Sequence, residues 1–258
     1  KVKMSHISYS EIKNWGKCPF YHKLMYIDGL SLFEGNLYTA FGKAIHAACE
    51  KVADLKTEEL QELFELQLIV ELELLEADYD KKIAASMREE GKTILSQLKE
   101  EMSKYFGEYT VLSVEEKLYE DIFIIDDDLQ FKGYIDMVVK VGDEIHILDW
   151  KTSTKGWSDW QKKDTLLKYQ LLYYKYYYSQ KHAVHPSKIK THFGILKRKT
   201  RSKNNIDFYE IESNKEKIRE SLNFLKKFMY NVKSKRYIKN RLSCTYCEFD
   251  DTEHCKKK

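Results

Sequence analysis

The sequence has little of what divides a chain into separate units or anchors it in a membrane. Only two prolines occur among its 258 residues, and there is no linker rich in proline, glycine or serine and no internal repeat. No run approaches the roughly 20 apolar residues that cross a bilayer, and residues 1–10 lack the apolar core of a signal peptide. We therefore expect one domain over residues 1–258, located in the cytoplasm and away from membranes.

Net charge is also small, at +3, but the charges are unevenly distributed. Residues 57–80 contain nine acidic side chains and no lysine or arginine, which leaves 44 basic against 32 acidic residues in the rest of the chain. A basic body with an acidic piece set apart favours a polyanionic partner on one face. A solvated acidic helix with scattered lysines is an equally good interpretation of the charge alone.

Cysteine is scarce as well, with five in the chain, but four of them form a pattern. Cys18 lies near the start, and Cys244, Cys247 and Cys255 form a C-x2-C-x7-C motif in the last fifteen residues. Without a secretory signal, metal ligation is favoured over disulfides, and thiolates suit zinc or iron–sulfur clusters. We expect residues 244–258 to pair with Cys18 at one soft-metal site.

The identity of one ligand in this expected site is open, and the site would also stabilise the fold. His254 could replace Cys255 as a ligand, because structural zinc accepts tetrahedral sets of cysteine and histidine. A crosslink from Cys18 to Cys244 would close a loop of about 226 residues. It would lower the conformational entropy of the unfolded chain and so stabilise the fold by about 5 kcal/mol. Such a clamp would join the chain ends and stabilise the fold between them.

Hydrophobic periodicity and turn residues predict an α/β chain. Helical stretches are expected at 8–14, 36–52, 57–105, 160–180 and 213–232, and strands at about 109–119, 129–141, 144–150, 188–198 and 206–212. Acidic turns at 126–128 and 142–143 should separate the first three strands. Residues 52–106 are predicted to be a helical insertion within this core.

Three side chains on two of the expected strands carry the chemistry. Asp136 follows Gly-Tyr-Ile, and thirteen positions later Asp149 begins the run Asp-Trp-Lys. A hairpin could bring both carboxylates to one point, and period-two alternation puts Asp149 and Lys151 on one strand face. Carboxylate oxygens of this kind hold Mg²⁺ or Mn²⁺ at phosphate substrates, and the lysine offsets charge at phosphorus. A surface salt bridge is the alternative, although apolar flanks favour a buried strand end.

Seven short motifs follow one another along the chain. They are Ser8-Tyr9-Ser10 with Cys18-Pro19-Phe20-Tyr21, Gly42-x3-His46, Val114-Glu115-x2-Leu118, Gly133-Tyr134-Ile135-Asp136, Asp149-Trp150-Lys151-Thr152, Gln170-x3-Tyr174 and Cys244-x2-Cys247-x7-Cys255. In this order they resemble the PD-(D/E)xK nucleases of the RecB-like branch, in particular its iron–sulfur members: CRISPR-associated adaptation nucleases, the AddB nuclease domain and exonuclease-V-like proteins. The resemblance implies a restriction-endonuclease-like core, with a mixed central sheet flanked by helices and an iron–sulfur clamp.

The resemblance also implies roles for individual residues. Asp136, Asp149 and the backbone carbonyl of Trp150 would ligate Mg²⁺ or Mn²⁺, and His46 would complete or adjust a second metal site. Lys151 would position the attacking water. These four side chains and one carbonyl would make up the metal-dependent part of the site.

Further roles follow from the remaining motifs. Glu115 would support the metal waters or the lysine, with Glu116 as the alternative because the strand register is open. Gln170 and Tyr174 would fix the lysine and the phosphate backbone. The four cysteines would hold a [4Fe–4S] cluster, with zinc as the alternative. A basic loop should contact DNA phosphates; its residues are Lys197, Arg198, Lys199, Arg201 and Lys203.

The activity that the resemblance implies is metal-dependent DNA hydrolysis. An exonuclease is favoured, acting on single strands or duplex ends by in-line attack of a metal-activated water, in DNA recombination, repair or processing. Its setting would be a bacterial, archaeal or phage-infected cell, with a helicase or recombination protein as the kind of partner. Two alternatives remain, a non-catalytic DNA-binding subunit of a helicase–nuclease complex and a spacer-processing nuclease of CRISPR adaptation.

Overall fold

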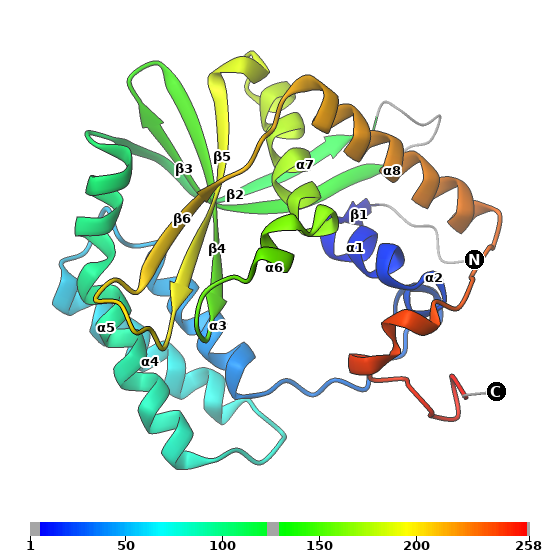
Figure 1. The fold of residues 1–258 in the computed structure, drawn as a ribbon, viewed down its shortest axis with the longest axis horizontal. Helices are drawn as coiled ribbons and strands as arrows, with labels where there is room; N and C mark the ends of the chain where they lie inside the picture. Colours follow the sequence, from blue (N-terminus) through cyan, green and yellow to red (C-terminus); the bar gives the residue numbers. More distant parts are fainter. Residues whose placement is uncertain (1–5, 123–128, 257–258) are drawn as a thin grey trace.

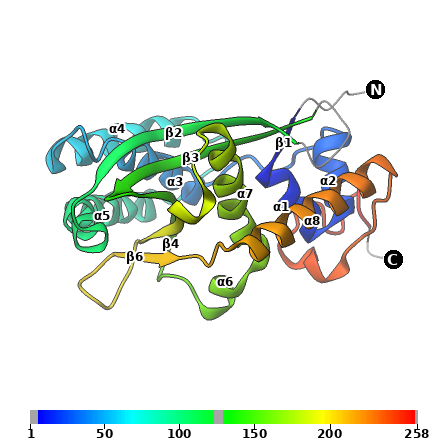
Figure 2. The ribbon, with the colours of Figure 1, turned by 90° about the horizontal axis from the view of Figure 1, so that it is seen from above.

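A computed structural model describes residues 6–122 and 129–256, and Figures 1 and 2 show its arrangement. The elements in chain order are β1 (His6–Ser8), α1 (Tyr9–Lys17), α2 (Pro19–His22), η1 (Lys23–Ile27), α3 (Leu37–Cys49), α4 (Thr57–Glu73), α5 (Lys81–Phe106), β2 (Thr110–Asp121), β3 (Gln130–Val141), β4 (Glu144–Ser153), α6 (Asp159–Lys163), α7 (Thr165–Lys181), η2 (Pro186–Lys188), β5 (Ile189–Lys197), β6 (Ile206–Glu210), α8 (Lys215–Lys233) and η3 (Arg241–Tyr246).

Short polar side chains fix where several of these helices begin. Ser8 accepts a hydrogen bond from the backbone of the third residue in α1, and Asn36 and Thr39 form a reciprocal capping box at α3. Asp164 and Asn214 cap α7 and α8 in the same way. Each cap satisfies backbone N–H groups that have no partner within the helix, so the local sequence sets the helix starts.

One mixed sheet forms the centre of the described molecule. Its strands follow the order β1-β3-β4-β5-β6, and β2 pairs with β3 outside this path. The pairs β1–β3 and β4–β5 are parallel, whereas β2–β3, β3–β4 and β5–β6 are antiparallel. Helices α6 and α7 provide the crossover that a parallel β4–β5 pair requires.

The strand β3 has a gap in its pairing that positions the site. β2 pairs with β3 almost along its length, so β1 and β4 must share the other side of β3. There β1 pairs with residues 130–132 and β4 with residues 137–141. Among the described residues, 133–136 therefore have no ladder partner on that side, and Asp136 lies at the point where β4 leaves β3.

Helices cover both faces of the sheet and create two buried clusters (Figure 1). On one face, Tyr173 and Tyr177 of α7 pack in a cluster with Phe131, Phe193 and residues of α1 and α8. The other face meets α3, α4 and α5; its cluster includes Phe41, Phe64, Leu95, Leu148 and Trp150. Burying apolar area on both faces is the main stabilising contribution to such a three-layer fold.

The expected mixed sheet flanked by helices is confirmed, with local corrections. The five expected strands are present, and the short parallel strand β1 is an addition that sequence patterning missed. The stretch 57–105 is two helices, not one, because α4 ends at Glu73 and α5 begins at Lys81. The helix expected at 160–180 is likewise divided into α6 and α7. The turn expected at 126–128 lies outside the described residues.

The proposed insertion, residues 52–106, belongs physically to the core. Leu60, Phe64 and Leu68 of α4 and Ile94 and Leu95 of α5 are at most 2% exposed and pack in the same cluster as strand residues. The insertion therefore forms part of one helical layer. Within residues 6–122 and 129–256, no helix has the length and apolar character that crossing a membrane demands.

Candidate functional site

Two buried aspartates meet at the gap beside β3. Met137 and Leu148 are the last β3–β4 pair, and Asp136 and Asp149 are the next residues on the two strands. Asp136 is 8% exposed and Asp149 only 1%. The Trp150 backbone N–H donates to Oδ2 of Asp136 at 2.6 Å, which ties the two strands together where regular pairing stops.

Asp149 is held between β4 and α7. Gln170 of α7 donates from Nε2 to Oδ1 of Asp149 at 2.6 Å, and Nζ of Lys151 lies 2.5 Å from Oδ2. That second approach is an ion pair without hydrogen-bond geometry, so Oδ2 is a buried acceptor with no hydrogen-bond donor among the described residues. A buried carboxylate oxygen in this condition favours a further cationic or donating group.

His46 approaches from the opposite helical layer. It lies on α3, and its Nδ1 is 3.5 Å from Oδ2 of Asp136. Burial lowers the pKa of His46 below its ordinary value; the charge of Asp149 and a hydrogen bond with the Trp150 backbone oppose that effect. The neutral ring is therefore favoured, and a neutral imidazole is the form that can act as a metal ligand.

The acidic groups also influence one another. Burial, followed by the charge of Asp149, raises the pKa of Asp136 well above its ordinary value, while Lys151 opposes the shift. Two carboxylates in a shared buried site disfavour each other's ionised form unless a cation compensates. Lys151 supplies one positive charge, and a divalent cation would supply the rest.

The structure separates the two candidate glutamates on β2. Glu115 stands opposite Asp136, between the pairs Val114–Met137 and Glu116–Ile135, and its φ of 46° is in the left-handed region. A non-glycine residue in that region is strained and is held there by its surroundings. Glu116 instead pairs with Lys181 at 2.5 Å and His182 at 3.0 Å, on the side away from Asp136. The geometry therefore favours Glu115.

Glu50 is a site residue that sequence reasoning missed. It caps the C-terminus of α3, one helical turn after His46, and its side chain hydrogen bonds to Glu115. Burial and then the Glu115 charge raise the pKa of Glu50 to about 7, and burial raises that of Glu115. The pair thus holds a proton near neutral pH. The four-residue spacing from His46 was the available signal, because such residues share a helix face.

Tyr174 is buried, which corrects the expectation that it contacts DNA. It is 5% exposed, and its hydroxyl accepts a hydrogen bond from Nε2 of Gln170 at 3.1 Å. Burial and then the Asp149 charge raise the pKa of Tyr174 above its ordinary value. Tyr174 therefore holds the Gln170 side chain in place through this hydrogen bond and is not exposed to a phosphate backbone.

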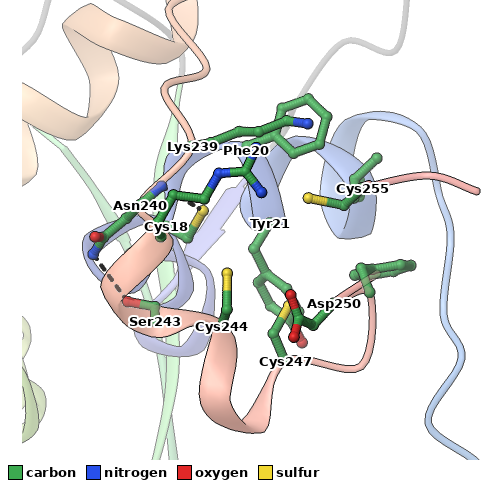
Figure 3. A pocket seen from close by; sticks show the side chains of 13 residues that line it. Cys18, Phe20, Tyr21, Lys239, Asn240, Ser243, Cys244, Cys247, Asp250 and Cys255 are labelled. Carbon is green, nitrogen blue, oxygen red and sulfur yellow. Dashed lines mark hydrogen bonds between the residues drawn. The ribbon is translucent and has the colours of Figure 1, made fainter. Parts of the chain in front are cut away.

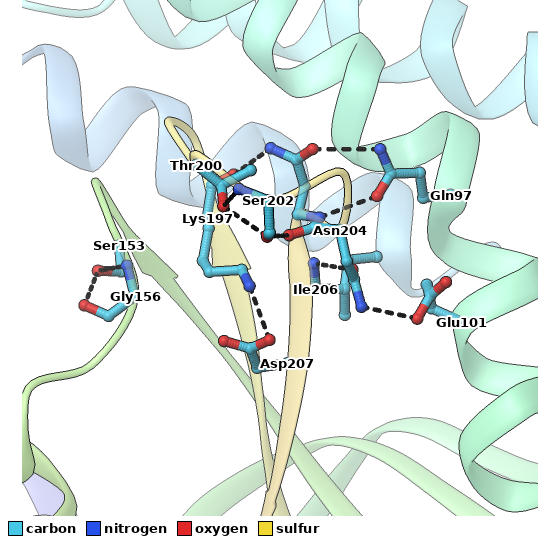
Figure 4. Close-up of polar contacts among 11 residues, drawn as sticks. Gln97, Glu101, Ser153, Gly156, Lys197, Thr200, Ser202, Asn204, Ile206 and Asp207 are labelled. Atoms are coloured by element: carbon cyan, nitrogen blue, oxygen red, sulfur yellow. Dashed lines mark hydrogen bonds and ion pairs between the residues drawn. The ribbon is translucent and has the colours of Figure 1, made fainter.

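The basic loop needs a similar correction for two of its members. Lys197 is 6% exposed and pairs with Asp207 at 2.7 Å (Figure 4). Arg198 is 8% exposed, contacts Glu90 at 3.2 Å and has its guanidinium 5.0 Å from the Tyr38 ring centroid. These two cations are engaged within the protein and join β5 to its neighbours.

The exposed members of the loop remain candidates for contact with DNA. Lys199, Arg201 and Lys203 are all exposed. The ammonium of Lys199 lies 3.7 Å from Glu90, and the Lys199 side chain is 60% exposed. These three residues can reach phosphates, in contrast to Lys197 and Arg198.

The four patterned cysteines lie around one hollow, although they are far apart in sequence. Cys18, Cys244, Cys247 and Cys255 all line a space of about 20 Å³, and their sulfur atoms turn toward it (Figure 3). A space of that size holds about one water molecule. His254 is not among the lining residues. Cys18 and the three C-terminal cysteines therefore line the same space, whereas their pairing at a metal site stays a prediction.

Metal-holding geometry itself is not formed by the side chains as they stand. Across residues 6–122 and 129–256, no group of three or more histidine, cysteine, aspartate or glutamate side chains is arranged to hold a metal ion. The donor types nevertheless fit two different metals. Buried carboxylates, one of which has an oxygen that accepts no hydrogen bond, suit a hard cation such as Mg²⁺, and four thiols suit zinc or an iron–sulfur cluster.

Comparison with known proteins identifies the family. A family model of the PD-(D/E)XK nuclease superfamily matches residues 6–252. The chain belongs to this superfamily. Among solved structures, a proposed exonuclease from Eubacterium rectale is similar over 94% of this chain and 87% of its own, with a TM-score of 0.59 and 14% identity. An identity this low shows a shared fold alone.

Other comparisons add no functional detail to the PD-(D/E)XK assignment. A solved structure of SSO0001 has 14% identity and covers 84% of this chain and 96% of its own, but its TM-score of 0.34 carries no argument. No curated protein matches the sequence. The superfamily and the mixed α/β fold agree with the sequence-based prediction, whereas the RecB-like iron–sulfur branch stays a prediction.

Proposed function

We propose that this PD-(D/E)XK protein is a Mg²⁺- or Mn²⁺-dependent deoxyribonuclease that acts as an exonuclease. The observation that carries the proposal is the pair of buried aspartates, Asp136 and Asp149, on adjacent strands beside Lys151. An inactive DNA-binding protein would have no need to bury like charges together, since doing so costs stability.

The proposed metal ligands come from three elements. Asp136 of β3, Asp149 and the Trp150 carbonyl of β4, and His46 of α3 would hold the cation. When bound, Mg²⁺ or Mn²⁺ would supply an activated water and charge neutralisation at the phosphate. Oδ2 of Asp149, which accepts no hydrogen bond from the described residues, and the neutral His46 ring support this ligand set.

The remaining residues would act directly on the reaction or hold others in place. Lys151 would donate to the attacking water or to a phosphate oxygen as negative charge develops. Glu50, whose pKa is raised to about 7 by burial and then by the charge of Glu115, would hold a proton in its hydrogen bond with Glu115 and could exchange it near neutral pH. Gln170 fixes the orientation of Asp149 through its 2.6 Å hydrogen bond, so α7 would preorganise the carboxylate.

A direct test uses Asp149→Ala in cleavage assays on end-labelled and circular DNA, single- and double-stranded, with Mn²⁺. We expect wild-type protein to degrade substrates with ends and Asp149→Ala to degrade none, because it loses the central carboxylate. Tyr177→Phe is the matched control on α7. Retained cleavage by Asp149→Ala would refute the site, and cleavage of circles would refute the exonuclease mode.

The cysteine hollow supports a second, structural metal site. We propose that Cys18, Cys244, Cys247 and Cys255 bind a [4Fe–4S] cluster, with zinc as the alternative, as in the RecB-like iron–sulfur branch. The narrow hollow would have to widen to accept a cluster, whereas zinc needs less space. Anaerobic purification, followed by iron, sulfide and zinc analysis, distinguishes them; absence of all three would overturn the site.

The biological setting is proposed on the same basis. A cytoplasmic role in DNA recombination, repair or processing fits an exonuclease, with single-stranded or end-containing DNA as substrate and a helicase or recombination protein as partner. A non-catalytic subunit of a helicase–nuclease complex and a spacer-processing nuclease are the alternatives. Hydrolysis by the isolated chain would exclude the first, and a requirement for integrase partners would indicate the second.

A further inference from the structure

A second hollow lies beside the cysteine site and has the character of a ligand groove. It has a volume of about 630 Å³, and its lining includes Lys17, Tyr21, Phe33 and Leu242. Such a volume is within the range of small-ligand sites, which combine apolar walls with a few polar groups. Phe33 is 54% exposed, so its ring is available to a ligand. We name this space the cysteine-side groove.

Both walls of the cysteine-side groove are fixed by hydrogen bonds between the chain ends. The carbonyl of Lys17 accepts from Asn240 Nδ2 at 2.7 Å and from Ser243 Oγ at 2.8 Å. Glu248 accepts from the Tyr21 hydroxyl at 2.8 Å and from the backbone of Leu32 at 2.8 Å. The groove is therefore largely formed before a ligand binds, which lowers the entropic cost of binding.

Two lysines of α1 lie next to each other on the helix, and one of them, Lys17, lines this groove. Lys13 and Lys17 are spaced by four residues and so share one helix face; we call them the α1 row. Nζ of Lys13 is 6.0 Å from the Tyr9 ring centroid. Lys13 is half-buried, and burial, with the charges of Lys17 and Lys151, lowers its pKa, while Asp149 opposes this. Lys13 is therefore close enough to Asp149 and Lys151 for their charges to act on it.

We propose that the cysteine-side groove and the α1 row bind the end of a single DNA strand and direct it to Asp136 and Asp149. A base would stack on Phe33, and phosphates would contact Lys17 and then Lys13. Stacking needs an unpaired base with an accessible face, so the proposed ligand is a single strand. The proposal rests on the nuclease function proposed above and specifies its substrate.

Charge explains why an anionic strand would follow this path. Lys17, Lys13 and Lys151 place cations in sequence along it, and each is in the field of the next. A phosphate beside each ammonium would relieve their mutual repulsion. The buried aspartates stand at the end of the path, where a divalent cation would offset their repulsion of the phosphate.

The test measures binding separately from cleavage. In an Asp149→Ala background, anisotropy of labelled oligodeoxythymidine is titrated across salt concentrations. Lys17→Ala should lower the slope of log affinity against log salt by about 0.7, and affinity about fivefold at about 0.1 M salt. Phe33→Ala should weaken binding roughly tenfold with the salt slope unchanged, and Phe33→Trp should restore it. Lys82→Ala, an exposed lysine on α5, should change neither.

The outcomes distinguish this proposal from the nuclease function itself. If wild-type protein degrades DNA but Lys17→Ala and Phe33→Ala bind oligodeoxythymidine as the background does, the path is wrong and the nuclease stands. Equal or tighter binding of blunt duplex, reduced by the same variants, would overturn the single-strand assignment. If wild-type protein degrades no DNA while the background binds single strands through Lys17 and Phe33, the path stands and the nuclease proposal fails.

Discussion

Replacing Gln170 with leucine tests whether α7 preorganises the catalytic carboxylate. Gln170 is 7% exposed, and among the described residues it alone donates a hydrogen bond to Asp149. Leucine keeps a similar volume but removes the donor, so Oδ1 of Asp149 would lose its partner in a buried site. Hydrogen bonds to charged groups stabilise by about 1.5–3 kcal/mol.

Two effects set the size of the change in stability. The lost hydrogen bond should destabilise the fold by about 2 kcal/mol. In the opposite direction, Oε1 of Gln170 is itself buried without a partner, so its removal recovers part of that amount. We expect a net fall of about 1–2 kcal/mol in the free energy of unfolding, measured by urea denaturation without added metal.

The effect on catalysis should be larger than on stability. If the hydrogen bond orients Asp149 in the transition state, losing about 1.5–3 kcal/mol lowers kcat/KM by roughly 10- to 100-fold. Tyr177→Phe is the matched control, because the Tyr177 hydroxyl is buried with no partner and its loss should be neutral or stabilising. Cleavage by Gln170→Leu within threefold of wild type would refute the preorganisation argument.

Three further changes test the fold and the linked charges. Gly91→Ala should lower the free energy of unfolding by about 1–3 kcal/mol in urea melts, despite a helix-propensity gain of about 1 kcal/mol, because its Cβ would lie 2.2 Å from the Phe64 ring; an unchanged midpoint would contradict this. Glu50 has a pKa raised from 4.5 to about 7 in the folded state, so stability should fall as pH rises through that window, and Glu50→Gln should flatten the decline in a series of melting curves. Cys244→Ser should lower the Tm of the metal-loaded protein, because it should reduce the free energy of unfolding by up to about 5 kcal/mol. Equal Tm values with and without chelator would exclude a structural metal.

The sequence determined the chemistry and most of the secondary structure. Asp136, Asp149 and Lys151 were recognisable because apolar strand residues flank acidic and basic groups, a pattern that is costly unless functional. Most strand and helix bounds followed from hydrophobic periodicity and turn residues, since both signals are local. The order of motifs was enough to indicate the PD-(D/E)XK superfamily.

Tertiary packing decided which side chains of each type are free to act. Lys197 and Arg198 read as basic loop residues, yet Asp207 and Glu90 engage them. Tyr174 was predicted to contact DNA, but it is buried and its hydroxyl accepts a hydrogen bond from Gln170 of the same helix, α7. Such outcomes depend on partners from distant segments, which local patterns do not encode.

The same reason explains Glu50 and the strand register. Whether Glu115 or Glu116 faces Asp136 depends on one position of pairing with β3, since a one-residue shift reverses the face of every side chain. Glu50 becomes part of the site only because α3 packs over that strand. The sequence thus supplied the reactive groups, and the three-dimensional pairing of β2, β3 and β4 decided which of them share one buried site.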